Sequence, residues 1–208
     1  MVAYISDAHL TIMNLGDSRA YLFVPDDLHL PYHVAPALRY SGPPASVEAS
    51  EPKTSPDGTL QLTTDHRPHN EYERALVSAR GAAITNDRVA GQLSVTRALG
   101  DADLQRWLLT TPEVWVWDLW QEQEVLTTDG VAECALIVFG CDGIWEVMEG
   151  SQAAAIARKA WQDAALTEKG SAIADRAAKQ IVDEASKGGS QDNLTAVVLY
   201  LGQRGKQS

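Results

Sequence analysis

The chain has 208 residues, of which 45% are hydrophobic and 22% are charged, and its formal net charge is −11. This acidic balance argues against general binding to nucleic acids or anionic membranes, because such binding needs clustered lysine and arginine. No apolar run approaches the roughly 20 residues that a membrane span requires, and the composition is that of a globular domain. The only cysteines, Cys134 and Cys141, form no CxxC pair, which predicts a cytoplasmic or other reducing compartment.

The N-terminal region is predicted to form β-strands close to its first residues. Two apolar runs, 10–15 and 20–24, flank the segment Gly16-Asp17-Ser18-Arg19, and this pattern predicts a β-hairpin with a tight turn. Residues 41–58 are rich in Pro, Ser, Glu and Gly, which predicts a surface loop or insertion. A short strand is expected at 60–63.

The middle of the chain combines one helix with short strands. The stretch 70–80 is predicted to be a helix that begins at Asn70, carries Glu71 and Glu73 in its first turn and ends at Gly81. Residues 88–95 predict a short strand or a pair of strands. The sequence Val-Trp-Val-Trp at 114–117 is a strong β signal.

The C-terminal half predicts an α+β layered domain. Residues 125–128 and 135–140 are expected to form a hairpin around Asp129-Gly130, and the second arm is apolar enough to be buried on both faces. Two amphipathic helices follow, at 151–165, with Ile156, Ala160 and Trp161 on one face, and at 171–186. A final strand is expected at 194–201. This order of elements differs from repeated βαβ units.

Four turns place an aspartate beside glycine or asparagine: Asp17, Asp101, Asp142 and Asp192. Asp17 and Asp142 follow predicted strands and Asp192 precedes one, so these turns can meet at a common rim. Converging carboxylates repel one another unless a cation lies between them, and oxygen ligands suit Mg²⁺ or Mn²⁺. The alternative is that each aspartate only shapes its own turn.

Six segments occur in this order: TIMNLGDSR at 11–19, TDHRPHN at 64–70, LSVTRALGD at 93–101, TPEV at 111–114, LIVFGCDGIWEVM at 136–148 and GSQDNLT at 189–195. Together they resemble the metal-dependent protein phosphatase 2C family of serine/threonine phosphatases. The resemblance implies a sandwich of two antiparallel sheets flanked by helices. It also implies hydrolysis of phosphoserine or phosphothreonine in phosphoproteins by a water that bridges two Mg²⁺ or Mn²⁺ ions.

Site residues follow from the same resemblance, segment by segment. Asp142 and Asp192 match ligands of the metal pair, and Asp17 matches a ligand of a third, accessory ion. No catalytic residue is expected beyond these metal ligands. Arg97 matches a scaffold residue, and residues 103–109 match a flap beside the site.

The chain lacks the family's DGHGG motif and N-terminal acidic pair. We therefore predict a partial phosphatase domain over 1–203, with an insertion at 41–58 and a tail at 204–208, and an open N-terminal sheet edge. Its expected partners are a phosphoprotein substrate and a complementing polypeptide at that edge. The alternative is a catalytically inactive pseudophosphatase that acts as a structural or protein-binding subunit.

Three further features have ordinary interpretations. His66 and His69 form an HxxH without further zinc ligands at suitable spacing, so they are expected to be loop histidines or helix-capping partners. Cys141 is expected to pack at a strand end rather than to act as a nucleophile. Trp115 and Trp117 are expected to pack on one face of a sheet.

Overall fold

A computed structural model of the chain describes residues 1–6, 9–23, 59–118, 127–128, 131–132, 135–164 and 167–201. The predicted loop at 41–58 and the tail at 204–208 lie outside these ranges, and the extent of the domain stays a prediction. The chain divides into two compact units. The first includes Met1–Ser18 and Thr63–Trp120, and the second includes residues 19–23, 59–62 and the described residues from 127 onward.

The first unit contains a three-stranded antiparallel sheet in the order β1 (Val2–Ile5), β2 (His9–Asn14) and β7 (Glu113–Asp118). Alternate residues of β2 are buried, as the period of two in a strand requires. Ile12 is paired in register with Trp115, and both side chains are buried. The four residues of β1, in contrast, are all exposed, and Val2 and Tyr4 keep 58% and 64% of their surface.

The predicted hairpin between the first two apolar runs is wrong. The second run forms β3 (Arg19–Phe23), which pairs with strands of the second unit, whereas β2 pairs with β1 and β7. Gly16 lies between the runs with φ +115°, and its backbone hydrogen bonds go to His66 instead of closing a hairpin turn. Each strand therefore belongs to a different sheet.

The helix of the first unit, α1 (Glu71–Ala79), begins as the sequence predicts. The Asn70 side-chain oxygen accepts hydrogen bonds from the backbone N–H groups of Tyr72, at 3.0 Å, and Glu73, at 3.5 Å. Gly81 follows the helix with φ +84°. The short pair β5 (Ile84–Thr85) and β6 (Arg88–Val89) covers only the start of the strand predicted at 88–95.

A second feature of this unit is a buried ion pair. The Arg97 guanidinium donates to both carboxylate oxygens of Glu73, and the Thr96 hydroxyl donates to the same carboxylate at 2.7 Å. Arg97 is fully buried and Glu73 is 1% exposed. Arg97 also donates to the Thr111 carbonyl at 3.0 Å, so this side chain joins α1 to the segment that leads into β7.

The second unit contains a four-stranded antiparallel sheet in the order β11 (Ala196–Leu201), β10 (Ala135–Gly140), β3, β4 (Thr59–Gln61). β10 pairs on one side with β11 and on the other with β3. Five of its six residues are buried, which confirms the prediction of a strand covered on both faces. The short strand predicted at 60–63 corresponds to β4.

The hairpin predicted between 125–128 and 135–140 is wrong. β8 (Thr127–Thr128) pairs instead with β9 (Val131–Ala132). β10 cannot pair with the segment at 125–128 because it is hydrogen-bonded to β3 on one side and to β11 on the other.

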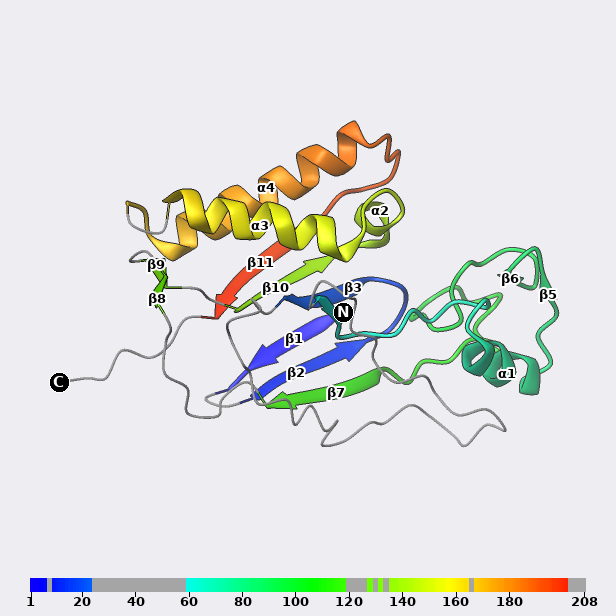
Figure 1. Cartoon of the computed structure of the whole chain (residues 1–208). Helices are drawn as coiled ribbons and strands as arrows, with labels where there is room; N and C mark the ends of the chain where they lie inside the picture. The colour runs from blue at the N-terminus through cyan, green and yellow to red at the C-terminus, as the bar shows by residue number, and fades with distance from the viewer. Residues whose placement is uncertain are drawn as a thin grey trace. The chain divides into compact units, whose positions relative to one another are not determined.

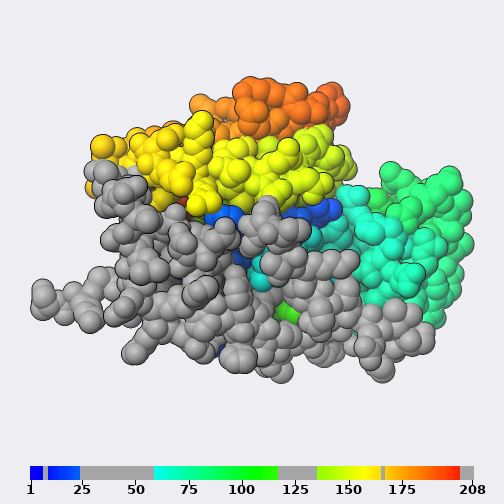
Figure 2. All heavy atoms as spheres, viewed as in Figure 1, coloured from blue at the N-terminus to red at the C-terminus, as the bar shows by residue number. Residues whose placement is uncertain are grey.

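Three helices complete the second unit: α2 (Asp142–Trp145), α3 (Gly150–Ala164) and α4 (Gly170–Lys187). Figure 1 shows α3 and α4 running side by side over one face of the sheet that contains β10 and β11. Their outer faces form a continuous surface in the space-filling view of Figure 2, where α3 is yellow and α4 orange. None of the described helices is both long and apolar enough to cross a membrane.

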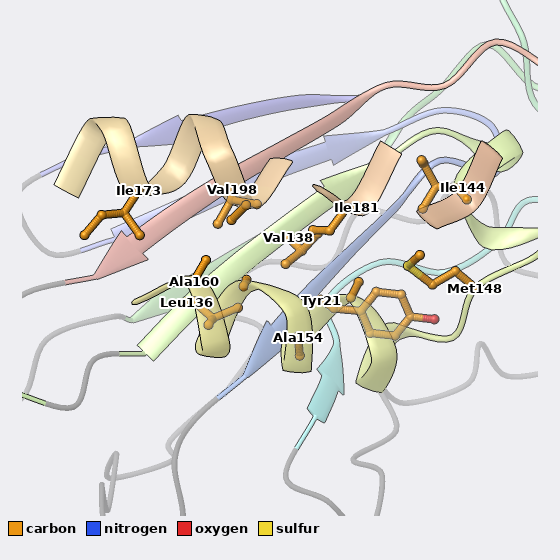
Figure 3. Close-up of a cluster of buried hydrophobic side chains, with 14 of the residues drawn as sticks. Tyr21, Leu136, Val138, Ile144, Met148, Ala154, Ala160, Ile173, Ile181 and Val198 are labelled. Atoms are coloured by element: carbon orange, nitrogen blue, oxygen red, sulfur yellow. The ribbon is translucent and has the colours of Figure 1, made fainter. Parts of the chain in front are cut away.

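The core of this unit lies between the two long helices and the sheet. Figure 3 shows Val138 of β10 and Val198 of β11 near Ile181 of α4, and Leu136 of β10 beside Ala160 of α3. Burying each such side chain stabilises the fold by roughly 1.5–3 kcal/mol. The face of α3 predicted from its sequence is partly right: Ala160 is buried, whereas Ile156 and Trp161 are partly buried beside the core. The antiparallel sheets and helices confirm the predicted α+β class.

Candidate functional site

Asp142 lies where the buried strand β10 ends and the short helix α2 begins. Its Oδ1 atom accepts a hydrogen bond from the N–H of Gly143 at 3.0 Å. Trp145 anchors this turn, because its indole N–H donates to the Gly140 carbonyl at 2.8 Å and its ring packs edge-on against Tyr21. A methyl group at Gly140 would come within 2.6 Å of the Trp145 ring, so glycine is needed for this close approach. The Asp142 backbone is thus held by the core.

Asp192 lies in the turn between α4 and β11. The helix ends at Gly188, and Gly189 has φ +95°, which turns the chain back toward the sheet. The Asp192 Oδ1 atom accepts a hydrogen bond from the N–H of Asn193 at 2.7 Å, the same local arrangement as at Asp142. Asp192 is exposed and Asp142 is half-buried, so both carboxylates are accessible to solvent.

The turns that carry these two aspartates are in contact. A methyl group at Gly143 would lie 2.7 Å from the Asn193 carbonyl oxygen and 3.1 Å from the Asp192 Cβ atom. Only glycine permits this approach without displacement of the neighbouring backbone. The structure therefore brings Asp142 and Asp192, which are fifty residues apart, to one rim of the second unit, beside the ends of β10 and β11.

The turn that carries Asp17 belongs to the first unit, and it is held by His66. The Gly16 N–H donates to His66 Nδ1 at 3.1 Å, and the His66 N–H donates to the Gly16 carbonyl at 3.2 Å. The side-chain amide of Asn14, also buried, donates to the Gly16 carbonyl at 3.3 Å. His66 is fully buried, and its Nε2 atom lies 3.7 Å from Glu113 Oε2. Because Nδ1 is an acceptor here, the neutral ring carries its proton on Nε2.

The Asp17 carboxylate itself forms an ion pair with Arg67. The Nε and Nη2 atoms of Arg67 both lie 2.6 Å from Asp17 Oδ2. The pair is mostly buried, with 13% of the aspartate side chain and 25% of the arginine side chain exposed. Arg67 therefore neutralises the carboxylate that the sequence assigns to an accessory metal ion, and that assignment stays a prediction.

The structure places the other residues that the sequence analysis singled out in different environments. Arg97 forms the buried ion pair with Glu73, which fits a scaffold role. Residues 103–109, the expected flap, contribute Leu104, Leu108 and Leu109 to the core of the first unit. Asp101 has φ +50° next to Gly100, so it shapes a turn. His69 lies 3.6 Å from Asp87 at the surface. The side chain of Trp117 lies outside the described residues.

Sequence reasoning missed two contacts that hold the site. His66 was expected to be an ordinary loop histidine, and it instead holds the backbone before Asp17. Cys141 was expected only to pack, and its thiol instead hydrogen-bonds to Asn193 and Thr195. No local pattern could reveal these contacts, because the partners are 50 to 54 residues away in the chain.

The donor chemistry at Asp142 and Asp192 fits a hard divalent cation. Two adjacent, solvent-accessible carboxylates match Mg²⁺, which is usually bound by one or two carboxylates and keeps several waters. Among the described residues no cationic side chain neutralises either carboxylate. The same residues contain no group of three or more His, Cys, Asp or Glu side chains arranged to hold a metal ion. In the described part of the chain, an ion at this rim could therefore take at most these two carboxylates, and any further ligands would be waters or come from elsewhere.

Comparison with known proteins points to one family. The family model described as protein phosphatase 2C matches residues 1–194. A similar protein from Arabidopsis thaliana, named "Probable protein phosphatase 2C 22", is 32% identical over 142 residues, which cover 68% of this chain and 34% of that relative. "Protein phosphatase 2C 50" of Oryza sativa subsp. japonica is 26% identical, and the match covers 99% of this chain and 46% of the relative. The chain thus spans about a third to a half of these relatives.

Solved structures show the same fold at lower identity. A serine-threonine phosphatase 2C from Toxoplasma gondii has a TM-score of 0.56 and 21% identity, and the match covers 95% of this chain and 56% of that one. A sex-determining protein from C. elegans has a TM-score of 0.61 and 21% identity, over 93% of this chain and 37% of that one.

Proposed function

The chain belongs to the protein phosphatase 2C family, and from this membership we propose that it contributes the metal-binding rim of a metal-dependent protein serine/threonine phosphatase. The observation that carries the proposal is the contact between the Asp142 and Asp192 turns. Asp142 and Asp192 hold Mg²⁺ or Mn²⁺, two ions in the complete site, and Asp17 holds an accessory ion. The substrate is a phosphoprotein that carries phosphoserine or phosphothreonine.

The chain's own groups hold and orient the metal-binding oxygens. Each aspartate accepts a hydrogen bond from the next backbone N–H through Oδ1, which restrains its carboxylate relative to its own turn. The absence of a side chain at Gly143 lets the two carboxylates share one ion. A divalent cation held by Asp142 and Asp192 would supply Lewis-acid chemistry, which lowers the pKa of a water and offsets charge on phosphoryl oxygens.

We further propose that the complete site needs a complementing polypeptide, which adds to the edge of the first sheet at β1. Support comes from the exposed apolar side chains of Val2 and Tyr4 along this strand. The two-carboxylate donor set also favours a second candidate function, an inactive binding subunit of the same fold. That candidate predicts a folded chain that never hydrolyses phosphopeptides.

The test is Mn²⁺-dependent hydrolysis of a phosphothreonine peptide by the purified full chain and by Asp142→Asn and Asp192→Asn. Asp175→Asn is the matched control, because it removes an exposed aspartate from α4 in the same unit. We expect Mn²⁺-dependent turnover in the wild type and control when the complementing polypeptide is present, and none in the two site variants. Turnover that survives either site substitution would contradict the assignment, and a folded wild type that stays inactive even with the complementing polypeptide would support the binding-subunit alternative.

A further inference from the structure

Three hydrogen bonds join Cys141 to the segment 193–195. The Cys141 backbone N–H donates to the Thr195 carbonyl at 3.2 Å. The thiol donates to the Asn193 carbonyl at 3.0 Å, and the Thr195 N–H donates to Sγ at 3.2 Å. The first bond extends the β10–β11 ladder beyond its last pair, Gly140 and Ala196. The other two depend on the side chain.

The residues that the thiol contacts lie next to the proposed metal ligands. Cys141 directly precedes Asp142, and Asn193 directly follows Asp192. The Asn193 carbonyl is also the atom that a methyl group at Gly143 would approach to 2.7 Å. The Asn193 carbonyl therefore accepts the hydrogen bond of the thiol and occupies the space that a side chain at Gly143 would need. Together these contacts fix the turn of Asp192 against the turn of Asp142.

We propose that the Cys141 thiol is a positioning group that sets the separation between the Asp142 and Asp192 carboxylates. It acts through the Asn193 carbonyl and the Thr195 amide, and touches neither substrate nor reacting atoms. A thiol is suited to this because it both donates and accepts a hydrogen bond, which serine can also do and alanine and valine cannot. The effect on metal binding rests on the proposed function, whereas the effect on the two turns does not.

The test compares Cys141→Ser with Cys141→Ala and Cys141→Val in the full chain, first without metal. Amide hydrogen exchange of Thr195 reports the bond to Sγ. The amide chemical shifts of Gly143 and Asn193 report the carboxylates, since each amide donates to one of them. We expect faster Thr195 exchange and shifted Gly143 and Asn193 resonances in Ala and Val, with values close to wild type in Ser. Valine fills the space of the thiol, and alanine remains informative should valine fail to fold.

The second readout is the Mn²⁺ dissociation constant, measured by calorimetry. Loss of groups that orient metal ligands typically costs 10–100-fold in affinity, so we expect about a tenfold weakening in Ala and Val and recovery in Ser. Unchanged amide shifts, or equal Mn²⁺ affinity in all four proteins, would overturn the positioning role. A wild-type chain that binds no Mn²⁺ would contradict the proposed function, while the metal-free amide data would still decide the role of Cys141.

Discussion

The contact at Gly143 makes a sharp prediction for Gly143→Ala. The added methyl would lie 2.7 Å from the Asn193 carbonyl oxygen, 3.1 Å from Asp192 Cβ and 3.3 Å from Leu194 Cδ2. Carbon–oxygen contacts rarely fall below about 3.3 Å, so the two turns must separate by about 0.6 Å. The obstructing oxygen belongs to the backbone, and no change of side-chain rotamer relieves the clash. The two carboxylates are therefore forced apart.

The expected size of the effect follows from this displacement. A misplacement of about 1 Å costs on the order of 100-fold in rate, so we expect Mn²⁺ affinity and turnover to fall by about tenfold. Overpacking costs roughly 1–3 kcal/mol in the free energy of unfolding, and the better helix propensity of alanine in α2 returns about 1 kcal/mol. The net loss of stability is therefore about 0–2 kcal/mol, similar in size to the about 1.4 kcal/mol of a tenfold loss in Mn²⁺ affinity, so the two quantities are measured separately.

The assay is calorimetric Mn²⁺ titration together with urea unfolding of the same samples. Gly170→Ala is the matched control, because a methyl at this first residue of α4 would meet Trp161 at an ordinary 3.8 Å. The control should bind Mn²⁺ as the wild type does. If Gly143→Ala also binds Mn²⁺ with wild-type affinity, the contact between the two turns does not control the metal site, and the reasoning is refuted.

Three further substitutions test side-chain contacts within the first unit. Arg67→Met removes the partner of Asp17 and should cost about 1–3 kcal/mol of stability in urea, and Mn²⁺ titration should show tighter binding at the accessory site; unchanged Mn²⁺ binding would argue against an accessory ion at Asp17. Glu73→Ala leaves Arg97 buried without its carboxylate and should destabilise by about 3–5 kcal/mol, so a change below about 1 kcal/mol in urea unfolding would be inconsistent with the buried pair. Asn70→Ala should cost about 1 kcal/mol, measured in the same way, and no loss would mean that the cap at α1 is dispensable.

The sequence correctly predicted those helices and strands that are determined by neighbouring residues. The cap at Asn70 and the stop at Gly81 placed α1 because both depend on neighbouring residues. The uniformly apolar stretch at β10 predicted its burial on both faces. The two hairpins were wrong for a shared reason. A turn between two apolar runs favours pairing of neighbours, but β3 and β10 pair with each other across more than a hundred residues.

In the candidate site, too, some features could be predicted from local sequence and others depend on the fold. Asp142 and Asp192 could be singled out because each lies in a short turn at a strand end and in a segment that resembles the family. The contact that joins them at Gly143 depends on the fold, as do the bonds of Cys141 to a segment 52 to 54 residues later. The ion pair of Asp17 with Arg67 likewise spans 50 residues. Sequence therefore singled out the candidate ligands, but not the groups that hold their turns in place.

The most direct test of the central claim is calorimetric titration of Mn²⁺ into the purified chain, Asp142→Asn and Asp192→Asn, with Asp175→Asn as the control for lost charge. The account predicts binding by the wild type and the control, and a loss of at least about tenfold in affinity in each site variant, because each removes one of two carboxylate ligands. Equal isotherms for all four proteins would contradict a shared cation site at Asp142 and Asp192.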